Sequence, residues 1–169
     1  MPGSAFTPYS LDLHERVALG IQTAIQTTLC PLPDPASGSY TIGTAQIYKQ
    51  DRPIPEVGCM FPCVIISIQE EIEEDDEAMG FEDDGAWFPC RLQIVNRLDA
   101  WDPKHDPAVK YWRKLIIDLF HGARSLPDCG EVWDVWVQRR PIFNENLPAL
   151  EYLTSDLVVR ARAIWQRAH

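Results

Sequence analysis

The sequence predicts one α+β domain, spanning residues 1–169, in which two main helices pack on a mostly antiparallel sheet. The length of 169 residues suits a single domain, and no internal repeat or domain-sized linker interrupts the chain. Two segments carry apolar residues at helical spacing, whereas the other apolar runs are rich in β-forming residues and are separated by turns. Apolar residues make up 46% of the chain, which is enough to fill one core.

The first helix is predicted near residues 11–29. Asp12 is followed three residues later by Glu15, a pattern typical of a helix start. Leu19 falls among the polar residues and hints at a partner surface. The apolar face consists of Leu13, Val17, Ile21, Ala24 and Ile25.

Three strands are predicted next, at residues 39–49, 63–68 and 87–97. The second strand reads CVIISI, a short apolar run that suits a largely buried strand. In the third strand, Cys90, Leu92 and Ile94 share one face. These segments are expected to contribute strands to the mostly antiparallel sheet.

The second helix is predicted at residues 106–121. Asp106 suits the N-cap, Pro107 the first helical position and Gly122 the position after the last turn. Its apolar arc consists of Val109, Trp112, Leu115, Ile116, Leu119 and Phe120. Burying that arc against the sheet would contribute about 1.5–3 kcal/mol for each large side chain fully buried.

Two last strands are predicted at residues 132–139 and 157–165. Trp133 and Trp136 are expected on opposite sides of the first of these, so that one indole enters the core and the other needs a second cover. Two arginines share one face of the final strand, where they are either solvated or paired with carboxylates of a neighbouring subunit. The candidate interface residues are Leu19, Ile117, Trp133, Trp136, Arg160 and Arg162.

The net charge of −10 is concentrated in residues 70–84, where ten of fifteen residues are acidic and none is basic. The rest of the chain is formally neutral, so no basic stripe for nucleic acid is present. We expect an exposed, mobile hairpin tip or loop. Three interpretations of this segment are open, namely a solvated loop, a negative surface that faces DNA in a channel, and a cation site. Its acidic residues are Glu70, Glu71, Glu73, Glu74, Asp75, Asp76, Glu77, Glu82, Asp83 and Asp84.

The sequence lacks nucleotide-binding loops and hydrolase motifs, so we expect no catalytic residue and no cofactor. His105, between Asp102 and Asp106, comes nearest to an acid–base group, but it lies at a helix start. The five cysteines are odd in number and not spaced for zinc, so we expect buried thiols and no metal site. Neither a secretory signal nor a membrane-length apolar run is visible, which favours a soluble product of the cytoplasm in which it is made.

The order of elements resembles the tail-terminator family (tail-completion, head–tail joining proteins) of long-tailed bacteriophages. An amphipathic helix opens the chain, Phe61-Pro62 leads into a β-run, and a third strand leads into the capped helix 106–121. A closing strand of alternating Val, Arg and Ala follows. The resemblance covers roughly residues 10–166, and the long acidic segment departs from it.

This resemblance implies a non-enzymatic virion protein that forms a ring, usually a hexamer, which caps the tail tube and joins it to the head. The implied partners are further copies of the chain, the tail-tube protein and head-completion or connector proteins. DNA would pass through the ring without specific binding, and the protein would reside in the tail or neck after assembly in the host cytoplasm. The residues leave open another connector or tail-tube subunit, a small cytosolic enzyme and an acidic adaptor protein.

Overall fold

The computed structural model describes residues 7–35, 38, 40–68, 71–74, 84–97, 106–143 and 151–165. The elements are α1 (Thr7–Ala24), a π-helical turn (Ile25–Leu29), a 3-10 turn (Thr44–Gln46), β1 (Ile47–Lys49), β2 (Cys63–Ser67), β3 (Glu73–Glu74), β4 (Asp84–Arg97), α2 (Asp106–Phe120), β5 (Val132–Arg139) and β6 (Tyr152–Trp165). The predicted α+β class is therefore confirmed.

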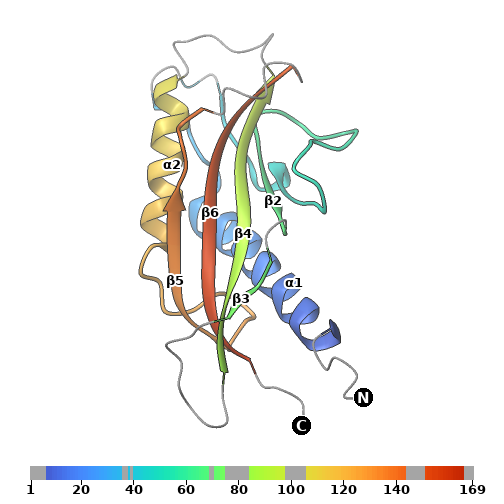
Figure 1. The fold of residues 1–169 in the computed structure, drawn as a ribbon. Coiled ribbons are helices and arrows are strands. Elements are labelled where there is room, and N and C mark those ends of the chain that lie inside the picture. The colour runs from blue at the N-terminus through green and yellow to red at the C-terminus, as the bar shows by residue number, and fades with distance from the viewer. Residues whose placement is uncertain are drawn as a thin grey trace.

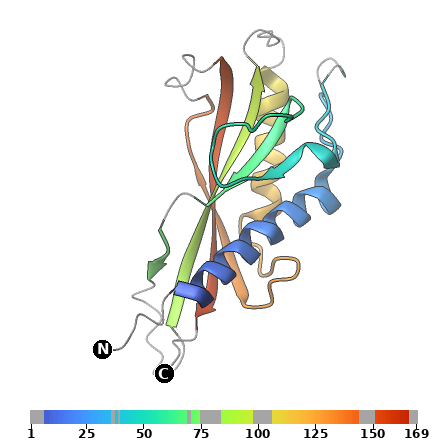
Figure 2. The same ribbon diagram turned by 90° about the vertical axis from the view of Figure 1, so that its right-hand side faces the viewer.

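One six-stranded sheet organises the fold. Its strands follow the order β1-β2-β4-β6-β5, and β3 pairs with β4 beyond the end of β2 (Figure 1). Neighbouring strands are antiparallel, except that β1 runs parallel to β2. Figure 2 shows how strongly the long strands twist along their length.

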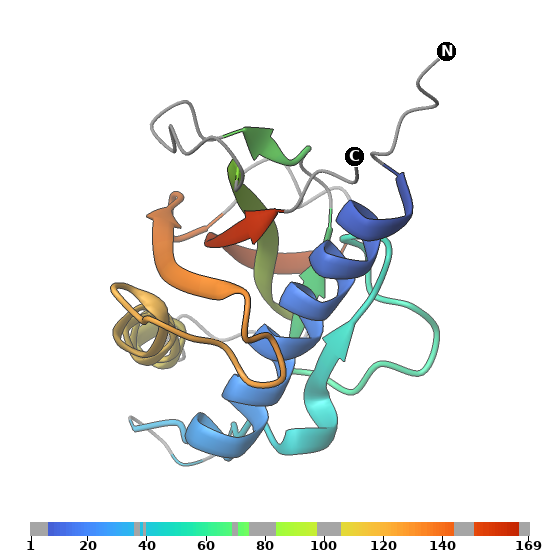
Figure 3. The same ribbon diagram turned by 90° about the horizontal axis from the view of Figure 1, so that it is seen from below.

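The main core lies between the helices and one face of the sheet, which we call the inner face (Figure 3). Every second residue of a strand points to this face, as the alternation of side chains requires. The largest fully buried side chains are Trp112, Phe88, Phe120, Ile21, Ile25, Leu32, Ile42, Ile65, Ile66, Leu92, Ile116 and Leu157. No helix in the described parts is long and apolar enough to cross a membrane.

Both predicted helices are confirmed, and the strands differ mainly in length. The start predicted for the first helix is wrong, because α1 begins at Thr7 and Asp12 therefore lies inside it. β1 is confined to Ile47–Lys49, because a 3-10 turn occupies residues 44–46 and Ile42 makes an isolated bridge to Leu32. β6 begins five residues before the predicted strand, because its pairing with β4 continues to Tyr152. The acidic segment is not entirely a loop, since Glu73 and Glu74 pair with β4.

A proline lies in the middle of the central strand β4. β2 pairs with residues 91–95 and β3 with residues 86–87, so Pro89 falls between the two partner strands. A proline, which has no backbone N–H, is tolerated there because neither β2 nor β3 would accept a hydrogen bond from that position. Its carbonyl oxygen accepts a hydrogen bond from Nε2 of the buried His14 on α1, at 2.7 Å. α1 therefore completes the hydrogen bonding of β4 at this point.

The guanidinium of Arg113 is buried between α2 and the sheet. It donates to Ser155 Oγ at 2.8 Å, to the Asp156 carbonyl oxygen at 2.8 Å and to the Arg140 carbonyl oxygen at 2.7 Å. Burial lowers the pKa of Arg113 from its ordinary value, because the charged form loses water. The three acceptors compensate for that loss and tie α2 to β6 and to the end of β5.

The outer edge of β5 is partly covered by the end of α2. The Gly122 N–H donates to the Val135 carbonyl oxygen at 2.8 Å, and the Val137 N–H donates to His121 Nδ1 at 3.4 Å. Gly122 has a positive φ of 81°, as a residue after a helix C-terminus often does. Backbone groups at the centre of this edge strand therefore already have partners.

We predict that His14→Leu lowers the free energy of unfolding by about 1–3 kcal/mol, because the Pro89 carbonyl loses its donor in a buried site. His14→Gln should lose less, because its amide can still donate. Burial lowers the pKa of His14, so the unfolded chain takes up a proton at higher pH than the folded one. Stability contributed by neutral His14 is therefore lost as pH falls below about 6.5.

Urea unfolding at pH 7.5 and 5.5 tests this prediction. The decrease in stability between the two pH values should be smaller in both variants than in the unaltered chain. An unchanged pH dependence in both variants would show that His14 is not the titrating group.

Candidate functional site

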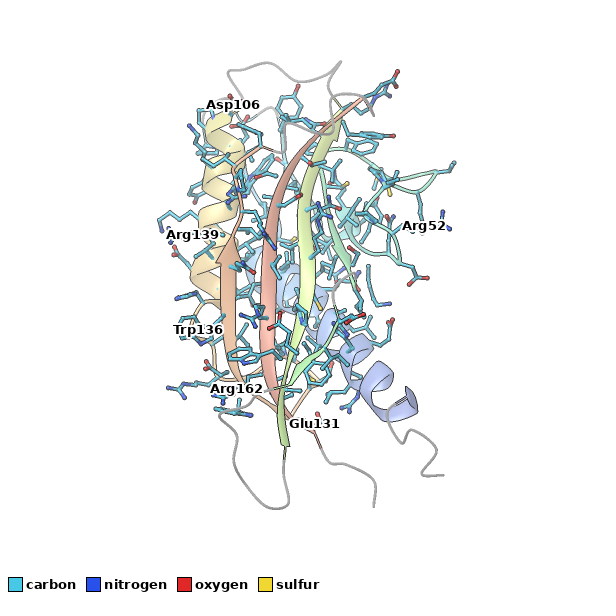
Figure 4. The ribbon with its side chains drawn as sticks, viewed as in Figure 1. Arg52, Asp106, Glu131, Trp136, Arg139 and Arg162 are labelled. Atoms are coloured by element: carbon cyan, nitrogen blue, oxygen red, sulfur yellow. The ribbon has the colours of Figure 1, made fainter. Side chains whose placement is uncertain are left out.

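The sheet face opposite the helices, which we call the outer face, carries tryptophans and arginines from three neighbouring strands. Cross-strand partners share a face, so the register places Trp87 of β4, Arg162 of β6 and Asp134 of β5 in one row. Pro89, Arg160 and Trp136 form the adjacent row. We call Trp87, Trp133, Trp136, Arg160 and Arg162 the tryptophan–arginine surface, part of which is labelled in Figure 4.

The two arginines of this surface stack on indole rings. The Arg162 guanidinium carbon lies 4.3 Å from the centre of the Trp133 ring and 5.5 Å from that of Trp87. The Arg160 guanidinium carbon lies 5.1 Å from the centre of the Trp87 ring, and Arg160 also forms an ion pair with Glu73. Such stacking holds flexible arginine side chains in place and leaves part of each indole accessible.

Trp133 and Trp136 are both exposed, which corrects the prediction that they face opposite sides of β5. Their exposed fractions are 36% and 51%. The register between β5 and β6 shifts between Val132 and Asp134, so Trp133 is the extra residue of a β-bulge. Because a bulge displaces the alternation by one residue, neither indole enters the core, and Val132, Val135 and Val137 fill the inner face instead.

The Trp136 indole is held at the edge of the sheet by two polar neighbours. Its Nε1 donates to Asp134 Oδ2 at 3.0 Å, and its ring meets the His121 ring edge-on with centres 5.1 Å apart. His121 Nδ1 in turn accepts a hydrogen bond from the Val137 N–H at the edge of β5. The orientation of this exposed tryptophan is thus set by α2 as well as by β5.

Farther along the outer face, charged groups are paired with one another. Asp156 of β6 accepts a hydrogen bond from Arg91 at 2.6 Å and one from Gln93 at 3.2 Å. Val158, the cross-strand partner of Arg91, is only 2% exposed. Cys63, Ile65 and Val95 form a small second apolar cluster. Among the described residues, the exposed tryptophans therefore lie toward the end of this face at which β3 pairs with β4.

The other predicted interface residues lie away from this surface. Leu19 is 48% exposed on α1, and Ile117 of α2 is half-buried against the main core. The structure thus brings together four of the six candidates, namely the two tryptophans and the two arginines.

Only part of the predicted acidic surface falls on described residues. Glu71 and Glu73 are exposed, Glu74 belongs to β3 and Asp84 begins β4. The other acidic residues named for this surface, Glu70, Asp75, Asp76, Glu77, Glu82 and Asp83, lie outside the described residues, as do Asp102 and His105.

The cysteines that are fully inside the protein have little reactivity at neutral pH. Burial raises the pKa of Cys63 to about 12 and raises that of Cys90 as well. A thiol that stays protonated is a poor nucleophile and a poor metal ligand. In the described parts of the chain, no group of three or more His, Cys, Asp or Glu residues is placed to hold a metal ion. Exposed tryptophan and arginine, which gather on the outer face, are typical of protein interfaces.

The fold of this chain is similar to that of a chain in a solved structure. No family model matches the sequence, and no curated protein matches it. A solved structure described as "Virion of native gene transfer agent (GTA) particle" contains a similar chain, with 19% sequence identity and a TM-score of 0.48. The match covers 72% of this chain and 81% of that chain.

We predict that the effects of removing Arg162 and Trp133 on the free energy of unfolding are coupled by about 0.5–2 kcal/mol. Either single variant already loses the stacking between the two side chains, so the double variant should lose less than the sum of both. Urea unfolding of Arg162→Ala, Trp133→Leu and the double variant measures this coupling. The matched control is the cycle of Arg162→Ala with Trp136→Leu, since Trp136 meets His121 instead. Equal coupling in both cycles would count against a specific stack.

Proposed function

We propose that this chain is a non-enzymatic structural subunit of a virus particle that assembles into a hexameric ring, caps the tail tube and joins it to the head. The observation that carries the proposal is the order of elements. An opening helix is followed by four strands, a second helix and two closing strands, and the strands form one mostly antiparallel sheet. Apart from the short strand β3, this agrees with the order on which the resemblance to tail-terminator proteins rests.

The tryptophan–arginine surface supports the part of the proposal that concerns self-association. Tryptophan and arginine dominate the energetics of many interfaces, because they bury large areas with few rotatable bonds or with fixed hydrogen-bonding geometry. Arg160 and Arg162 are already held by ring stacking, so little further side-chain entropy is lost when a neighbour binds. Leu19, exposed on the opposite side of the helical layer, would serve a different contact, with the tube or with a head-completion or connector protein.

We further propose that the acidic segment 70–84 rims the opening through which DNA passes. Ten carboxylates in each copy, repeated around a ring, would repel phosphates, so DNA would slide without binding specifically. Salt limits the range of this effect to roughly 8 Å at about 0.15 M. The segment must therefore lie close to the DNA path.

We predict that the purified chain, alone or co-expressed with the tail-tube protein, forms a closed multi-copy particle. Native mass spectrometry gives the number of copies, and negative-stain images show whether the particle is a ring. A chain that stays monomeric and never joins the tube would refute the ring proposal.

We predict that replacing the ten acidic residues of segment 70–84 by Asn and Gln leaves assembly intact but makes the ring retain double-stranded DNA. Assembly should survive because the Glu73–Arg160 pair is half-exposed and such pairs contribute little. A filter-binding assay at low and high salt measures DNA retention, which added salt should abolish. If the neutral ring handles DNA as the acidic ring does, the segment does not face the channel.

A further inference from the structure

The loop between β1 and β2 exposes three large apolar side chains. The exposed fractions are 49% for Ile54, 107% for Val57 and 52% for Met60. Single exposed apolar residues are common, but three within seven residues of one loop form a patch that a partner can cover. Figure 1 shows this loop, in green, standing away from the rest of the fold on the β2 side. We call residues 51–60 the apolar loop.

The apolar loop and the exposed indole of Trp136 lie at opposite ends of the sheet. The loop connects β1 and β2, which begin the strand order, whereas Trp136 belongs to β5, which ends it. Figure 4 shows Arg52 of the loop on one side of the molecule, and Trp136 and Arg139 on the other. A contact between two such unlike surfaces is head-to-tail, and it closes into a ring when the rotation between copies allows it.

The charges of the two sides favour a head-to-tail contact over a symmetric one. The apolar loop contains two acidic residues and one basic residue, whereas the five residues of the tryptophan–arginine surface include two arginines and no acid. Two copies that met loop to loop, or arginine surface to arginine surface, would bring like charges together. Asp51 and Glu56 are exposed beside the apolar residues of the loop, and Arg162, which stacks on Trp133, supplies positive charge beside the indoles.

We propose that the apolar loop of one copy packs on Trp136 and Trp133 of the next copy. Ile54, Val57 and Met60 would cover the indoles, while Asp51 and Glu56 would face Arg160 and Arg162. The occupant of the tryptophan–arginine surface is thus a second copy of this chain. This inference rests on the proposed self-association and names the two unlike surfaces that meet.

Two single variants and their mixture test the contact. Val57→Asp damages the loop side only, and Trp136→Glu damages the sheet side only. Both residues are exposed, so both variants should fold, which thermal unfolding verifies. Each variant alone should lose at least about tenfold in association constant. An equal mixture should form pairs with one chain of each kind and nothing larger, because only one intact loop can meet one intact tryptophan face.

Native mass spectrometry of the full chain, with one variant isotope-labelled, identifies the pairs. Tyr111→Asp, on α2, is the matched control, since it also places a charge at an exposed apolar position but should associate as the unaltered chain does. If the unaltered chain forms rings and both variants do too, the contact is wrong while the ring proposal stands. If only Val57→Asp dissociates and the mixture gives no pairs, the loop contacts another surface. An unaltered chain that is monomeric up to millimolar concentration overturns both proposals.

Discussion

The pairing of β4 with β6 is the constraint on which the rest of the structure depends. The two strands stay in register from Asp84 opposite Trp165 to Arg97 opposite Tyr152. β2 and β3 attach to one side of this pair and β5 to the other, and both helices pack across one of its faces. Because α2 and β5 lie between the two strands in sequence, the pairing closes a long loop, and a long ladder is needed to offset that entropy.

A fixed register also decides which chemistry each face carries. The same ladder that places Phe88, Ala161 and Val135 in the core places Trp87, Arg162 and Asp134 in a row on the outer face. A slip of one residue would exchange the two sets, so the apolar core indirectly selects the side chains that face a partner. The alternation of Val, Arg and Ala in β6 therefore specifies both the packing of the helices and the positions of the exposed arginines.

Periodicity in the sequence predicts the helices and most strands, because their apolar faces recur at the spacing of the element that buries them. It fails where one residue breaks the local rule. The bulge at Trp133 has no turn residue to mark it, and the burial of Arg113 depends on acceptors supplied by distant strands. The alternation in the sequence predicts that Arg160 and Arg162 share a face. It does not indicate that both stack on Trp87, because neighbours on different strands are determined only by the register of the sheet.

The covered edge of β5 limits how copies of this chain can join. An edge strand with free N–H and C=O groups is a template on which another strand can be added, and repeated addition leads to fibrils. Here the Val135 carbonyl oxygen and the Val137 N–H, at the centre of that edge, already form hydrogen bonds with Gly122 and His121. A strand of another copy is therefore hindered from adding to the sheet at the edge of β5. Association at this edge must then be mediated by side chains. Side-chain contacts can be weak and reversible, which allows wrongly joined copies to separate before an assembly becomes permanent.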